Sequence, residues 1–161
     1  MEHRPFDLYR KVVPCTAAEV LAFHSARKEF IPGVPGHVIE VTEAFAFKPA
    51  GPAFVVTLGN FIQGRYNNTA KLSVVSLGVT GFLDVTVPSS GFTRPGGITL
   101  VTGDEANVAD AAGKSIVSGT NNNADYTGEG SPITLVFLYR LIPTTADGVA
   151  AVTDANPIGR F

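Results

Sequence analysis

The sequence predicts an all-β protein, a jelly-roll-like antiparallel β-sandwich with one short helix in its N-terminal half. Three observations lead to this fold class. Short segments rich in β-branched and aromatic residues recur along the chain, and several of them alternate apolar with polar positions. Clusters of Gly and Pro separate these segments, as turns separate the strands of a sandwich. A single segment carries the start signal of a helix.

Length and composition indicate a single domain that binds other proteins rather than nucleic acid. The 161 residues fit one domain with a sizeable core. Charged residues make up only 16% of the chain, which also holds 11 Phe. A surface with few charges and many aromatic rings is typical of proteins that bury part of it against other proteins. The formal net charge of −2 provides no basic field for a nucleic-acid partner.

The sequence also predicts where the chain folds. No apolar run approaches the ~20 residues of a membrane helix, so we expect no membrane partner. Residues 1–5 are not followed by the apolar segment of a secretory signal. Because Cys15 is the single cysteine, no intrachain disulfide is expected. These features indicate synthesis and folding in a cytoplasm.

The N-terminal part is expected to hold a strand and the helix. Residues 8–13 predict the first strand, closed by Pro14. Thr16 and Glu19 have the spacing of a capping box, in which each side chain accepts a hydrogen bond from the other residue's backbone N–H. The helix is therefore expected to start after Thr16 and to run to about Ser25, with Val20, Leu21 and Phe23 packed inward.

A long strand is expected to follow. The short segment 29–31 leads into a Pro/Gly turn at 32–36, and residues 37–47 predict a strand. Strict alternation along this strand predicts that one face carries Ile39, Val41, Phe45 and Phe47.

The middle of the chain predicts further short strands at 53–58, 61–66, 71–77, 82–87 and 98–102. Residues 88–97 are expected to form a loop, and 103–113 a loop or one helical turn.

The C-terminal part predicts a strand at 115–118, a polar loop at 119–130 and a last strand at 133–142. The odd positions of this last strand are all apolar and the even positions are mixed, which indicates a central strand or one covered by a partner. The predicted organisation is an N-terminal arm and first strand (1–14), one sandwich domain (15–143) and a C-terminal tail (144–161).

A search for chemistry-bearing motifs predicts no catalytic residue, no metal ligand and no cofactor. The chain lacks the nucleophile elbow, a close His pair, the EF-hand pattern and the glycine motifs that bind phosphates. Cys15 and His24 could form a thiol–imidazole pair, but a buried, inert thiol is the favoured interpretation. Asn121, Asn122 and Asn123 with Tyr126 could line a sugar site, and turn formation explains the same residues.

Two segments together resemble the head decoration, or cement, proteins of tailed bacteriophages. The first, 16–47, combines a capped short helix, a short strand, a Pro/Gly turn and a long strand. The second, 115–143, combines a short strand, an Asn/Thr/Gly-rich arm and a terminal strand with Tyr-Arg near its end. The chain departs from the pattern at Arg27-Lys28, where Thr-Pro is expected, in 88–113, and in a tail that continues past the usual end.

The resemblance implies a jelly-roll-like sandwich that self-associates, most often as a trimer and sometimes as a dimer. It implies a position on the outer surface of the capsid, bound to the major capsid protein, where the assembly stabilises the shell after DNA packaging. We expect the two arms and the polar loop to make the partner contacts, through Phe6, Leu8, Tyr9, Asn121, Asn122, Asn123, Tyr126, Ile158 and Phe161. The alternatives are another virion jelly roll, from a tail or fibre, and a carbohydrate-binding β-sandwich module.

Overall fold

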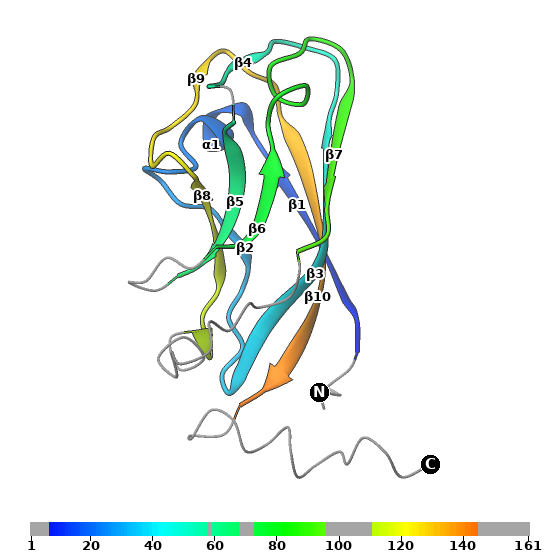
Figure 1. Cartoon of the computed structure of the whole chain (residues 1–161), viewed down its shortest axis with the longest axis vertical. Helices are drawn as coiled ribbons and strands as arrows, with labels where there is room; N and C mark the ends of the chain where they lie inside the picture. Colours follow the sequence, from blue (N-terminus) through cyan, green and yellow to red (C-terminus); the bar gives the residue numbers. More distant parts are fainter. Residues whose placement is uncertain (1–6, 58, 68–72, 96–110, 145–161) are drawn as a thin grey trace.

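A computed structural model describes residues 7–57, 59–67, 73–95 and 111–144. They form two four-stranded antiparallel sheets packed together, a two-stranded ladder and one short helix (Figure 1). The predicted all-β sandwich with one helix in the N-terminal half is confirmed at this level.

Sheet A has the strand order β1-β10-β3-β7. Its strands are β1 (Tyr9–Cys15), β10 (Ile133–Pro143), β3 (His37–Lys48) and β7 (Ser89–Thr93). Sheet B has the order β2-β8-β5-β6, with β2 (Glu29–Ile31), β8 (Ile116–Thr120), β5 (Phe61–Tyr66) and β6 (Ser73–Gly78). The ladder pairs β4 (Phe54–Val55) with β9 (Thr127–Gly128), and α1 spans Ala17–Leu21.

The core lies between the two sheets, and three aromatic rings connect them. Phe137 of β10 stacks on Phe30 of β2 with ring centroids 5.3 Å apart, and Phe23 meets Phe30 edge-on at 5.5 Å. The predicted alternation of the last strand is confirmed, because its odd positions face this core and β10 is a central strand of sheet A. These rings belong to a larger cluster of buried apolar side chains, whose burial is the main force that holds the layers together.

The capping box is confirmed, and α1 is shorter than predicted. Glu19 N–H donates to Thr16 Oγ1, and Thr16 N–H donates to Glu19 Oε2 at 2.8 Å. The helix ends at Leu21 rather than near Ser25. The N–H groups of His24 and Ser25 instead donate to the carboxylate of Asp125, which draws the chain out of the helical path.

A β-bulge in β3 overturns the predicted face of that strand. Glu43 pairs with Leu138, but the next pair is Val41 with Tyr139, so Thr42 is an extra residue. Thr42 Oγ1 donates to the carbonyl of Leu138 at 3.0 Å. Since one extra residue reverses the alternation, Ile39 and Val41 share the core face with Ala44 and Ala46. Phe45 and Phe47 lie on the outer face of sheet A, and their predicted place beside Ile39 and Val41 is wrong.

Three further predictions about the path of the chain are wrong. Residues 82–87 form no strand, because the N–H groups of Phe82 and Leu83 both donate to the carbonyl of Val79 in a tight turn. The predicted loop at 88–97 contains β7. Pro14 does not end β1, because β1 is an edge strand and an edge position tolerates a residue without an N–H.

The remaining differences concern the ends of elements. The predicted strand at 53–58 shrinks to β4, and the predicted loop at 119–130 contains β9 and the last residues of β8. The predicted strand at 98–102 lies outside the described residues. β1 pairs along its whole length with β10, so the first strand is an integral part of sheet A.

Candidate functional site

The outer face of sheet A carries an apolar row that crosses all four strands. The register pairs Val12 with Val136, Val136 with Phe45, and Phe45 with Phe92. The rings of Phe45 and Phe92 lie 4.8 Å apart. Val12 is 44% exposed and Phe92 55% exposed, so the row is open to solvent at both of its ends.

The two neighbouring rows extend this patch. On one side, Pro14, Thr134 and Phe47 pair across the sheet, and Phe47 is 48% exposed. On the other side lies Leu138. We call this set of residues the apolar face: Val12, Pro14, Phe45, Phe47, Phe92, Val136 and Leu138. A continuous apolar patch of this kind marks a site of protein contact more often than scattered exposed apolar residues do.

Charged side chains border the apolar face at one end. Arg94 Nη2 lies 2.8 Å from Glu43 Oε1, and the Arg94 guanidinium carbon is 5.8 Å from the centre of the Phe92 ring. Arg140 and Glu40 are register partners on neighbouring strands, one step further along. An apolar centre with a charged border that includes Arg is the usual layout of a protein interface.

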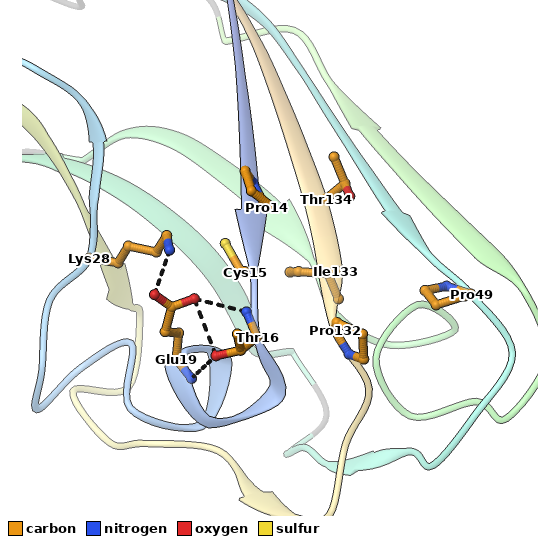
Figure 2. Close-up of a pocket in the computed structure, with 9 residues that line it drawn as sticks. All are labelled: Pro14, Cys15, Thr16, Glu19, Lys28, Pro49, Pro132, Ile133 and Thr134. Carbon is orange, nitrogen blue, oxygen red and sulfur yellow. Dashed lines mark hydrogen bonds and ion pairs between the residues drawn. The ribbon is translucent and has the colours of Figure 1, made fainter.

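A pocket of about 420 Å³ opens where β1 ends and β10 begins (Figure 2). One wall carries the ion pair between Lys28 Nζ and Glu19 Oε1, at 2.6 Å. The Lys28 ammonium, followed by the Thr16 amide, lowers the pKa of Glu19 below its usual value of 4.5. The lining residues are Pro14, Cys15, Thr16, Glu19, Lys28, Pro49, Pro132, Ile133 and Thr134.

The pocket holds no reactive thiol. Cys15 is 1% exposed, and burial raises its pKa to about 12. A thiol with such a pKa stays protonated at neutral pH and is a poor nucleophile and metal ligand. The predicted buried Cys15 is confirmed. Within the described residues, no three His, Cys, Asp or Glu side chains gather as a metal site requires.

The predicted contact residues fall at two opposite ends of the sandwich (Figure 1). Leu8, which is 56% exposed, precedes the first residue of β1, and Tyr9 stacks on Tyr139 with ring centroids 5.5 Å apart. Asn121, Asn122 and Asn123 lie near the other end, beyond β8. The structure therefore does not bring these two groups together. Phe6, Ile158 and Phe161 lie outside the described residues.

The three asparagines organise their own loop. Asn121 Oδ1 accepts from Phe61 N–H at 2.8 Å, and its Nδ2 donates to the carbonyl of Gly59 at 3.1 Å. Asn122 Oδ1 accepts from Ala124 N–H. Asn123 adopts a positive φ of 53° and accepts from Arg65 Nη1 at 3.3 Å. These bonds support the turn interpretation of the asparagines, because the side-chain oxygen of each accepts a hydrogen bond within the chain.

Tyr126 is part of the core rather than of the surface. It is 4% exposed, and burial raises the pKa of its hydroxyl. Its ring therefore offers no exposed platform on which a sugar could stack. Figure 1 places the adjoining ladder of β4 and β9 at the same end of the sandwich as α1.

The residues that sequence reasoning missed are Phe45, Phe47 and Phe92. The segment 44–47 is apolar at four successive positions, so both of its faces are apolar. That pattern signals a strand with cover on both sides, but it does not tell which face meets the core. Phe92 lies in a strand that the sequence does not predict, because this strand is short and rich in Ser, Gly and Thr.

The chain matches no protein-family model and has no significant similarity to a curated protein. Among the described residues, no helix is long and apolar enough to cross a bilayer.

Proposed function

We propose that the protein is a structural component of a tailed-phage virion, a decoration protein that binds the outer surface of the head and stabilises the shell after DNA packaging. The apolar face is the observation that supports this most directly. It spans the full width of sheet A and keeps three large side chains about half exposed, namely Val12, Phe47 and Phe92. Such a face gains free energy when another protein covers it, at roughly 25 cal/mol per Å² of apolar surface.

We further propose that the sandwich is a jelly roll. Without the short β4 and β9, the described part of the chain forms eight principal strands. Counted along the chain, sheet A holds the first, eighth, third and sixth, and sheet B the second, seventh, fourth and fifth. This order is the one that two interlocked Greek keys produce, and jelly rolls recur in viral capsid proteins. The topology thus supports the resemblance drawn from segments 16–47 and 115–143.

The proposal names two partners, the major capsid protein and further copies of this chain, and it assigns no catalytic activity and no cofactor. It places the protein on the virion surface after synthesis in the host cytoplasm. The arms that contain Phe6, Leu8 and Tyr9 at one terminus, and Ile158 and Phe161 at the other, stay predicted capsid contacts. A tail or fibre jelly roll shares the same fold. The burial of Tyr126 and the hydrogen bonds accepted within the chain by the three asparagine side chains favour the capsid proposal over a carbohydrate-binding module.

Binding to capsid shells tests the proposal. The genome that encodes this chain is expected to encode a major capsid protein close by, and shells assembled from that protein provide the probe. Shells mixed with increasing amounts of this chain should retain it on sedimentation, up to a fixed copy number, and should then melt at a higher temperature. Shells of an unrelated phage serve as the control.

Absence of saturable binding at about 100 μM chain would refute the capsid proposal. A variant that lacks residues 144–161 separates the tail from the sandwich. If its copy number on shells equals that of the full chain, the tail takes no part in binding.

A further inference from the structure

We propose that the apolar face binds the same face of a second copy of this chain, about a two-fold axis that runs parallel to the strands between β10 and β3. The inference deepens the proposed function by assigning the surface of self-association. It needs no capsid for its test, so the two can fail separately.

The first argument is the distribution of side-chain size on the face. The half on β1 and β10 carries Val12 and Val136, and the half on β3 and β7 carries Phe45 and Phe92. A two-fold axis between β10 and β3 exchanges the two halves. The half of each copy with the smaller valine side chains then lies against the half of the other copy with the larger phenylalanine side chains. A face that is complementary to itself is what a closed two-fold contact requires.

The second argument is the position of Phe47. Phe47 and Thr134 are register partners on the two strands that flank the axis, so the axis places Phe47 of one copy over Thr134 of the other. Thr134 and Pro14 also line the pocket of about 420 Å³ (Figure 2). The half-exposed Phe47 ring thus lies over a residue that also lines the pocket. Face-to-face sheets pack about 10 Å apart, which leaves room for such interleaved side chains.

The third argument is charge. Arg140 of β10 and Glu40 of β3 are also register partners across the axis. The exchange therefore sets Arg140 of each copy against Glu40 of the other, at the border of the contact. Arg10 meets Arg94, but Arg94 already pairs with Glu43 at 2.8 Å, which offsets the repulsion. Two attractive pairs at the border favour this orientation over others.

The other in-plane two-fold axis, perpendicular to the strands and through the row of Val136, is unfavourable. It would set the row of Glu43 against the row of Phe47 on the same strand. Glu43 and its ion pair with Arg94 would then lose water against an aromatic ring and gain no charged partner from the second copy. The strand-parallel axis sets Glu43 opposite Leu138 of the second copy, and it alone brings Arg140 to Glu40 twice, which favours it over the perpendicular axis. It also fixes the stoichiometry, because a closed two-fold contact of this face makes a dimer.

Sedimentation equilibrium of the purified full-length chain tests the surface. We expect a dimer that dissociates on dilution, and at least a tenfold weaker dimer for Phe47→Glu and for Phe92→Glu. The matched control is Phe61→Glu, which makes the same change at a 37% exposed ring on sheet B and should leave the dimer intact. Thermal unfolding of each variant verifies that it is folded, which the exposure of the replaced rings favours.

A mixing experiment tests the two-fold geometry. Arg140→Glu alone and Glu40→Arg alone each place like charges opposite one another twice, so both should dimerise more weakly than the unmodified chain. In a mixed dimer of the two variants both pairs are again opposite in charge. Mixing should therefore restore dimer to a level that neither variant reaches alone, a gain that effects within one chain cannot produce.

Three results would overturn the inference: a monomer at every concentration up to about 100 μM, a dimer insensitive to Phe47→Glu and Phe92→Glu, or a trimer. Each leaves the capsid proposal to its own test, because a chain that fails to dimerise through this face can still bind shells. Conversely, a dimer with the expected variant pattern that binds no shell supports the inference and refutes the capsid proposal.

Discussion

Replacement of Phe137 by Ala is expected to destabilise the protein far more than the same replacement at Phe92, although both rings belong to sheet A. Phe137 is fully buried on the inner face and stacks on Phe30, the ring that joins sheet A to sheet B. Phe92 is 55% exposed on the outer face. The pair of variants therefore applies one chemical change to the two faces of a single sheet.

The magnitudes follow from burial. A fully buried Phe→Ala change costs about 3–5 kcal/mol, because it removes transfer free energy and leaves a cavity. At Phe92, the same change removes the free energy gained from burying about half of the ring, the contact with Phe45 and the cation–π contact with Arg94. Together these losses amount to about 1–2 kcal/mol. For a chain of this size, 1 kcal/mol lowers the melting temperature by about 2–4 °C. A loss of about 4 kcal/mol at Phe137 thus corresponds to about 8–16 °C.

Urea unfolding monitored by circular dichroism measures both changes. The midpoint should shift while the slope of free energy against urea stays constant, since the fold is unchanged. The samples should be dilute, at about 1 μM, so that self-association through the outer face does not add to the stability of the unmodified chain. Equal losses at the two positions would refute the assignment of inner and outer faces to sheet A.

Three further predictions concern single sites. Cys15 should not react with a thiol reagent at pH 8 until urea unfolds the chain, because its pKa of about 12 keeps the thiol protonated. The pKa of Glu19 is lower in the folded chain than its unfolded value of about 4.5, so the pairing of Glu19 stabilises the fold above that value. This stabilisation is lost as the pH falls through the folded pKa. Thermal melts should therefore show that Glu19→Gln loses less stability on acidification than the unmodified chain does. In urea melts, Gly130→Ala should lower the free energy of unfolding by about 1–3 kcal/mol more than Gly36→Ala does. Both glycines have a positive φ, but a methyl group at Gly130 would overlap the buried Phe54 ring, whereas nothing lies near Gly36. Equal effects would contradict the packing of Phe54.

Local signals in the sequence predicted those elements that depend on neighbours along the chain. Thr16 and Glu19 cap α1 as their spacing indicates, because both partners lie within one turn. The alternation of β10 survives intact, because the strand is central and regular on its inner face. The position of Asp125, which ends α1 early, could not be predicted, since it lies about a hundred residues further along the chain.

The candidate site escaped prediction for a related reason. A one-residue bulge at Thr42 reverses every later side chain of β3, and no residue type in 37–47 marks where the extra residue falls. The outer positions of Phe45 and Phe47 therefore depend on pairing with β10, a contact between distant segments. At 82–87 the alternating pattern predicts a strand that does not form. The Asp84 carboxylate accepts from Gly81 N–H and holds a local turn, and this turn outweighs the β propensity of the segment.

Pro14 in the edge strand β1 has a consequence for assembly at high local density. Each free edge of a sheet can recruit a strand from another molecule, and copies crowded on one lattice would meet edge to edge repeatedly. Pro14 has no N–H to donate, and at the other edge β7 has only five residues. Sheet A is thereby a poor template for strand addition along either edge. Growth into fibres is disfavoured, and the outer face of sheet A stays the proposed surface of self-association.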